Sequence, residues 1–339
     1  MPVSESLSTD RPHRLAAPAL FLVLGLVFAT WAARIPAIRD GLALNPAELG
    51  LALLCGGGGA VFSFPIAAWL VHRRGAKQAA WHAGVALILV LPLLAAAPNM
   101  AALMLLMVGL GASQTSFNVA INAVGSGMEK ASGRSLLSSL HAWYCVGSLA
   151  GALLGSLLAG AGVPAVLHFN AIAALLLLML FFARRALPDD MQDATRAGSR
   201  FLLPKGPLLA LGAICFCVAI AEGAITDWSS LYLRDVLSAS EGVAPLGYAA
   251  FSAVMLGARL AADRAKERHG ARRVVVAGAM LASAGIVIVT AALNLATTII
   301  GFGLTGGALL PCFRSCSALR AGAGRPHWQA WRRWDTAAS

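Results

Sequence analysis

Ten apolar runs of about twenty residues follow one another along this chain, and a helix of that length crosses the hydrocarbon core of a bilayer. The residues are 58% hydrophobic and only 12% charged, whereas soluble domains carry roughly 25% charged residues. The sequence therefore predicts an all-α integral membrane protein with about ten transmembrane helices. The predicted spans are 15–35, 48–71, 79–97, 100–125, 141–163, 165–183, 207–229, 244–262, 273–293 and 295–311.

The formal charge of +11 comes mainly from Arg and Lys in alternate connections between these runs. Such an asymmetry sets the orientation of a membrane protein, because cytoplasmic loops carry the excess of Lys and Arg. The pattern predicts a multi-pass protein with a cytoplasmic N-terminus. No phosphate-binding or base-stacking motif accompanies the basic residues, so we expect the lipid bilayer and not nucleic acid as their partner.

One connection, 184–206, is long and polar, and we interpret it as a cytoplasmic linker. Six spans precede it and four follow it. We expect a cytoplasmic tail at 1–14, a six-helix bundle at 15–183, an incomplete four-helix bundle at 207–311 and a non-membrane tail at 312–339.

Landmarks of the first bundle recur in the second at a nearly constant offset of 195 to 197 residues. A shared offset predicts a parallel repeat of six spans. The pairs are Trp31 and Trp228, Arg39-Asp40 and Arg234-Asp235, Leu49-Gly50 and Leu246-Gly247, and Gly75 and Gly270.

A full second copy would contain two more spans, but the sequence after Pro311 is basic and rich in Trp. Two explanations are open. Either the reading frame of a longer protein shifted near residues 308–312, or a genuine basic aromatic tail lies on anionic lipid. The neighbouring frame of the gene distinguishes them, because two further apolar spans there would support the shift.

Two carboxylates, Glu222 and Asp227, lie toward the far end of the seventh span. A charge at the bilayer centre costs roughly 2.5 to 3.5 kcal/mol on insertion scales, so such an acid usually faces a cavity or a partner. Glu222 is the candidate for proton coupling, and Asp227 either joins it or is solvated at the interface. Arg34 either extends to the headgroups or pairs with one of these acids and closes the outer side of the protein.

Amide side chains recur every four residues in the fourth span, which places Gln114, Asn118 and Asn122 on one face of a helix. Amides in hydrocarbon need partners. The stripe therefore either bonds neighbouring helices or lines a substrate cavity, to which we also assign Trp31 and Trp228.

The fifth span carries Gly147, Gly151 and Gly155 on one face, a ridge that predicts close helix packing. His141 opens the same span and is either an interfacial anchor or a ligand or proton carrier. The sequence holds no nucleophile–base pair, nucleotide loop or metal-ligand cluster. We therefore expect neither an enzyme nor a cofactor nor a metal site.

Two polar loops resemble the gating loop of the major facilitator superfamily, whose usual form is Gly-x-Leu-x-Asp-Arg-x-Gly-Arg-Lys. The loop after the second span has His72 in place of the aspartate, and the loop after the eighth span is closer to the pattern. The resemblance implies two six-helix halves, of which about ten helices, six and then four, are present. The implied gating residues are Arg73, Arg74, Gly75, Lys77, Asp263, Arg264 and Gly270.

Within this superfamily the chain is similar to the fucose-permease-like, YbjJ-type branch, through residues 31–36, 118–122, 222–228 and 248–251. That branch commonly has Asp where Asn118 stands, which leaves the second-half acids to carry a proton. The resemblance implies a monomeric secondary transporter of the bacterial inner membrane. It would move a sugar-like or other polar solute by alternating access, coupled to protons. Open alternatives are an inactive truncated carrier, multidrug-type efflux, and a membrane sensor or scaffold.

Overall fold

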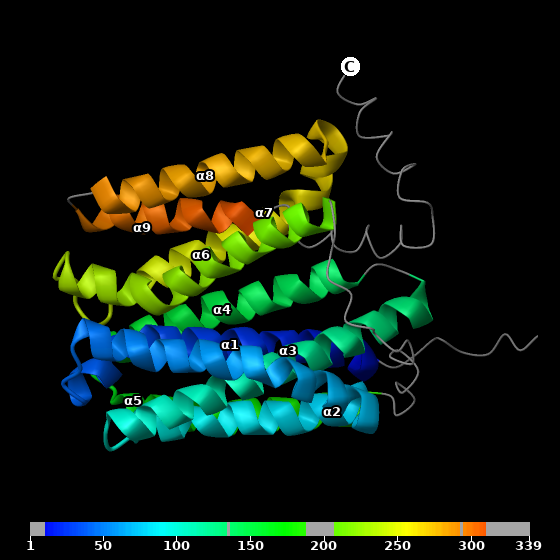
Figure 1. Cartoon of the computed structure of the whole chain (residues 1–339), viewed down its shortest axis with the longest axis horizontal. Helices are drawn as coiled ribbons and strands as arrows, with labels where there is room; N and C mark the ends of the chain where they lie inside the picture. The colour runs from blue at the N-terminus through cyan, green and yellow to red at the C-terminus, as the bar shows by residue number, and fades with distance from the viewer. Residues whose placement is uncertain (1–10, 134–135, 188–206, 292–293, 310–339) are drawn as a thin grey trace, which may run out of the picture.

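The regular structure in the described part of the chain is helical, and Figure 1 shows the helices as two stacked groups of long rods, α1–α5 and α6–α9. The computed structural model describes residues 11–133, 136–187, 207–291 and 294–309. The helices are α1 Arg11–Gly41, α2 Pro46–Ala95, α3 Met100–Ser132, α4 Leu137–Gly160, α5 Ala165–Ala186, α6 Pro207–Asp235, α7 Leu246–His269, α8 Ala271–Ala291 and α9 Leu295–Thr305, followed by the short 3₁₀ helix η2 at Gly306–Leu309. Most of the predicted linker and the tail after residue 311 lie outside these residues.

Length and composition make six helices of the described part suitable for crossing a bilayer, namely α1 to α5 and α8. Helices α7 and α9 contain shorter apolar stretches, Leu246–Ala262 and Leu295–Thr305, and α6 extends over 29 residues. Since α2 contains two of the predicted spans, these helices account for all ten apolar runs. The predicted all-α membrane bundle is confirmed.

Helix α2 is a hairpin of two helical arms. Gly75 inside it has φ 78° and ψ 159°, a conformation that glycine adopts without steric cost. Gly59, before this point, packs against Val108 of α3, and Val90, after it, lies beside Gly109 of α3. Both arms therefore contact the same turn of α3, and the chain must reverse its direction at Gly75.

The glycines at 56–59 differ in what they face, and this difference gives a stability test. A Cβ at Gly59 would overlap the carbonyl oxygen of Val108, whereas a Cβ at Gly58 would meet nothing within 4 Å. We expect Gly59→Ala to destabilise the protein by about 1–3 kcal/mol, because α2 and α3 must move apart. Gly58→Ala should leave stability unchanged or raise it by up to ~1 kcal/mol. Thermal unfolding in detergent compares the two, and equal melting temperatures would contradict the packing described.

Helix α1 lies at the centre of the first group. A Cβ on Gly147, Gly151 or Gly155 of α4 would overlap α1, and one on Gly25 of α1 would overlap α4. The predicted glycine ridge is therefore confirmed as the surface on which α4 packs against α1.

Backbone angles support the internal repeat. Ala43 and Ser238 have φ 51° and 53°, and Gly75 and Gly270 have φ 78° and 79°. The members of each pair are 195 residues apart. A non-glycine residue at positive φ is uncommon, so its return at the same offset indicates two related halves. We call α1–α5 the first half and α6–α9 the second half.

Candidate functional site

The two halves meet along α4 and α7, which pack against each other. At one end of this contact the Ser156 hydroxyl donates a hydrogen bond to the Gly242 carbonyl oxygen, and the backbone of Gly160 lies against Gly242. Because α4 runs toward this end and α7 runs away from it, the two helices are antiparallel. We call the contact of α4 with α7 and α6 the seam.

One face of α7 supplies the second-half side of the seam. Tyr248, Ser252 and Met255 have no exposed surface, and the helical period adds Arg259 to the same face. Arg259 lies one helical turn after Met255, whose sulfur is 3.9 Å from Arg259 Nη2. A charged residue inside the predicted span 244–262, near its end, is the signal that identifies Arg259, and the sequence reasoning gave it no role at this site.

Glu222 joins the second half to the first. The Tyr144 hydroxyl of α4 donates a hydrogen bond to Glu222 Oε1 at 3.3 Å. The Thr226 hydroxyl donates to the backbone oxygen of Glu222 at 2.7 Å. Glu222 therefore faces a protein partner across the seam. Tyr144 had no role in the sequence reasoning, because a tyrosine in an apolar run carries no distinctive signal.

The amide stripe of α3 continues to the seam as a chain of hydrogen bonds. The Asn122 amide donates to Asn118 Oδ1 at 2.6 Å, and His141 Nε2 lies 3.2 Å from Asn122 Oδ1. The His141 ring meets Phe21 edge to face at 4.9 Å between centroids. Asn118 itself is exposed and Gln114 is half-buried. The stripe is thus bonded to His141 at its Asn122 end and is accessible at Asn118.

Two reciprocal ion pairs hold the halves together at the end where α1 and α6 finish. Arg39 binds Asp235 through both oxygens, with Nη2 and Oδ1 2.9 Å apart. Arg234 Nη2 lies 2.6 Å from Asp40 Oδ2. The Arg-Asp dipeptides that mark the repeat therefore exchange partners. We call these four residues the clasp, and the end that contains them the closed end.

Arg34 is buried near the closed end, with 2% of its surface exposed. Its Nη2 donates to the Val163 carbonyl oxygen at 2.8 Å and its Nε donates to His168 Nδ1 at 3.2 Å. These partners belong to the first half, so the predicted pair of Arg34 with Asp227 or Glu222 is not formed in this structure. The reason is that two acceptors lie nearby, the Val163 carbonyl oxygen in the turn before α5 and His168 Nδ1 in the first turn of α5.

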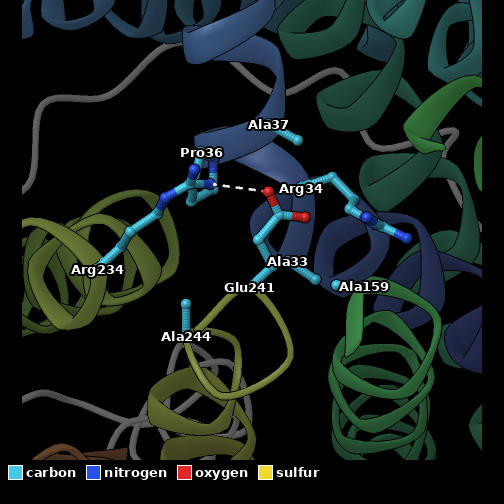
Figure 2. Close-up of a pocket in the computed structure, with 8 residues that line it drawn as sticks. All are labelled: Ala33, Arg34, Pro36, Ala37, Ala159, Arg234, Glu241 and Ala244. Carbon is cyan, nitrogen blue, oxygen red and sulfur yellow. Dashed lines mark ion pairs between the residues drawn. The ribbon is translucent and has the colours of Figure 1, made fainter. Parts of the chain in front are cut away.

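Figure 2 shows the hollow beside Arg34, between α1, α4 and the connection after α6. Arg234 and Glu241 form an ion pair of 3.5 Å within it, and the Arg34 side chain extends away from this pair. Among the described residues, the clasp therefore supplies the direct ion pairs between the halves at this end.

The two tryptophans assigned to the cavity differ in burial. Trp31 is 4% exposed, whereas Trp228 is 41% exposed and lies near Gly50 at the start of α2. Asp227 is half-buried and makes no hydrogen bond or ion pair with the residues that the structure describes. Trp228 thus touches both halves, while Trp31 belongs to the core of the first half.

The first loop assigned to gating is attached to the end of α5. The Lys77 ammonium donates to the Leu187 carbonyl oxygen, and Arg73 lies over the Trp69 ring at 5.7 Å. In the second loop Gly270 repeats the positive φ of Gly75. Arg74 and Arg264 are exposed, and the Asp263 side chain lies outside the described residues.

Glu129 has a structural contact that sequence reasoning missed. Its Oε1 accepts hydrogen bonds from the backbone nitrogens of Leu136 and Leu137, at 2.6 and 3.0 Å. These are orphan donors at the first turn of α4. No group of three His, Cys, Asp or Glu side chains suited to a metal occurs in the part of the chain described.

Two repeated helical halves that enclose a polar seam are the architecture of a secondary transporter. The chain belongs to the Major Facilitator Superfamily, which it matches over residues 16–327. This membership indicates a transporter rather than an enzyme. The match also extends beyond residue 311, into the segment that the sequence reasoning treated as a tail.

Relatives of known sequence agree with this assignment. An MFS-type transporter of Yersinia pestis is 32% identical over 304 residues, covering 90% of this chain and 77% of the relative. The membrane protein MosC of Rhizobium meliloti is 30% identical over 290 residues, covering 84% of this chain and 70% of the relative.

Solved structures share the fold at low identity. The nucleoside transporter NupG aligns with a TM-score of 0.70 at 14% identity, covering 91% of this chain and 82% of NupG. A bacterial homologue of the human lysosomal transporter Spinster, inward-facing and occupied, aligns with a TM-score of 0.69 at 15% identity. The alignment covers 89% of this chain and 73% of the homologue. A D-xylose–proton symporter aligns with a TM-score of 0.61 at 14% identity, covering 88% of this chain and 80% of the symporter.

Proposed function

We propose that this chain is a proton-coupled secondary transporter that carries a small polar solute across the inner membrane by alternating access. The observation that carries the proposal is the hydrogen bond from Tyr144 to Glu222. It places an acid of the second half against the first half, deep in a seam that is closed at one end. Glu222 is half-buried there, so its access to water depends on how far the two halves are separated.

The closed end faces the outside in this proposal. Basic residues gather in the connections at the opposite end, and such loops are cytoplasmic. The clasp joins the halves at the closed end, so the conformation is inward-facing and the N-terminus is cytoplasmic. One structure of the same fold, the Spinster homologue, is also inward-facing. We propose a monomer with halves at 15–183 and 207–311, joined by the linker 184–206.

The amide stripe is the proposed place of the solute. Gln114, Asn118 and Asn122 combine donors and acceptors that suit hydroxyl groups, and Asn118 is exposed. A nucleoside transporter and a D-xylose–proton symporter share the fold, which supports a small hydroxylated solute.

Proton transfer at Glu222 couples to closure through desolvation. A carboxylate that leaves water must be neutralised or strongly hydrogen-bonded. In the closed seam Tyr144 supplies one donor. We propose that protonated Glu222 allows the seam to close, and that an opened seam lets water take the proton. The gating loops around Gly75 and Gly270 would follow this movement.

Labelling of Asn118→Cys in a cysteine-free background tests the access route. A membrane-impermeant maleimide should label this variant at least about tenfold faster in inverted vesicles than in right-side-out vesicles, because the clasp blocks the outer route. Ser240→Cys, exposed in the connection after α6, is the control and should show the opposite preference. Equal rates from both sides, or no labelling from either, would contradict an inward-facing polar cavity.

A further inference from the structure

Asn122 is the central member of a hydrogen-bond network with Asn118 and His141, and a backbone contact fixes its orientation. Asn122 Nδ2 lies 2.8 Å from the Asn118 carbonyl oxygen and 2.6 Å from Asn118 Oδ1. A backbone carbonyl oxygen only accepts hydrogen bonds, so the end of Asn122 beside it must be the amide nitrogen. Both hydrogens of this nitrogen are therefore used in bonds to Asn118.

The orientation of Asn122 determines which ring nitrogen of His141 carries a proton. Asn122 Oδ1 lies 3.2 Å from His141 Nε2, and an amide oxygen only accepts hydrogen bonds. His141 Nε2 must therefore be the donor. The His141 side chain is buried, with 7% of its surface exposed, and Phe21 of α1 packs edge to face against the ring, so the ring is held in place.

The same orientation determines what Asn118 can offer to a bound molecule. Asn118 Oδ1 accepts the hydrogen bond from Asn122, which leaves the amide nitrogen as the other end of the group. In the part of the chain that the structure describes, this nitrogen donates no hydrogen bond, and Asn118 is exposed. The accessible end of the network therefore presents N–H donors.

We propose that the solute presents an acceptor oxygen to Asn118, and that His141 is the positioning residue that fixes this polarity. The hydrogen bonds all run in one direction, from His141 through Asn122 to Asn118, so the solute is the last acceptor. A hydroxyl, ring or carbonyl oxygen suits such a donor, whereas an ammonium group, which only donates, does not. This proposal rests on the proposed function and names the chemistry of the solute group at that site.

The position of the proton on His141 tests the direction of the hydrogen bonds without any solute. Nuclear magnetic resonance of the full-length protein, labelled with nitrogen-15 at histidine and held at pH 8, distinguishes the two ring nitrogens. We expect the proton on His141 Nε2, and His141→Gln identifies the signal by its loss. A proton on Nδ1 alone would mean that Asn122 is turned round, which would overturn the proposal.

Binding of D-glucose and D-glucosamine to the purified full-length protein tests the solute group. At pH 6 the second sugar carries an ammonium group in place of one hydroxyl, and thermal-shift titrations give the dissociation constants. We expect D-glucose to bind about tenfold or more tightly, because two donors that face each other both stay unpaired. Asn118→Asp offers a carboxylate oxygen in place of the N–H donors and should reverse the preference.

Two variants of His141 separate positioning from packing. His141→Leu removes the donor, so Asn122 can turn and most of the preference for D-glucose should disappear, whereas His141→Gln keeps an amide donor and should retain it. Equal binding of the two sugars by the wild type, binding of neither, no reversal in Asn118→Asp, or an unchanged preference in His141→Leu would overturn the proposal. Those outcomes leave alternating access intact if Asn118→Cys still shows its one-sided labelling.

Discussion

Glu222→Gln should abolish proton-driven accumulation of solute while exchange of solute across the membrane continues. Glutamine keeps the shape of the side chain and an oxygen that can accept the Tyr144 hydrogen bond, but it cannot carry a proton. One proton per solute moving down one pH unit supplies about 1.4 kcal/mol, a tenfold concentration ratio. The wild type should therefore reach up to about a hundredfold accumulation across two pH units, and the variant should stop at equal concentrations.

Proteoliposomes with an imposed pH gradient and a radiolabelled solute that the wild type carries measure this difference. Counterflow in the same vesicles shows whether Glu222→Gln still exchanges solute. Glu267→Gln is the matched control, because Glu267 is exposed near the end of α7 and should accumulate solute like the wild type. Accumulation by Glu222→Gln that still follows the pH gradient would remove the proton role from this residue.

Reversal of one clasp charge should open the closed end. In Asp235→Arg, three guanidinium groups face Asp40, and the bidentate pair with Arg39 is lost. Partly exposed ion pairs contribute about 0.2–1 kcal/mol each. Loss of one pair and repulsion against the other should cost about 1–2 kcal/mol, which shifts the ratio of closed to open molecules about 5- to 30-fold.

The rate at which Asn118→Cys is labelled from the outside measures this shift. A second variant, in which the two charges of the pair are exchanged, tests whether charge pairing is its cause. Asp235→Arg should raise the labelling rate from the outside, and the double variant Arg39→Asp, Asp235→Arg should restore slow labelling. High salt should reduce the difference in labelling rate between Asp235→Arg and the protein with the intact clasp, because salt screens exposed charges. Glu241→Gln is the control, since Glu241 pairs with Arg234 inside one half. A double variant that labels as fast as the single one would show that charge pairing is not what holds this end.

Apolar length and periodicity were enough to predict the helices and their packing ridge. Residues close together in the sequence determine three of these features. They are the ten apolar runs, the glycine face of α4 and the reversal at Gly75. The repeat was also visible, and the matching φ angles of Ala43 and Ser238 support it independently. These features depend on residues near each other in sequence or on a simple offset.

Partners across the seam were harder to predict from sequence. The sequence alone does not reveal that Arg34 bonds His168 at the start of α5. Nor does it reveal that Tyr144, and not a basic residue, bonds Glu222. Such contacts depend on the angle and register at which two halves pack. The clasp could be predicted only in part. The repeated Arg-Asp dipeptides were recognised as landmarks of the repeat, but the ion pairs between them became evident only from the fold.

The movement of the two halves is measured most directly by two spin-label distances in one protein. One pair, at Ala47 and Ser240, spans the closed end, and the other, at Ala131 and His269, spans the opposite end; all four positions are exposed. Double electron–electron resonance on wild type at pH 8 and on Glu222→Gln should show the populations of the two distances changing in opposite directions, one end closing as the other opens. Distances that stay fixed, or that both lengthen or both shorten together, would contradict alternating access about this seam.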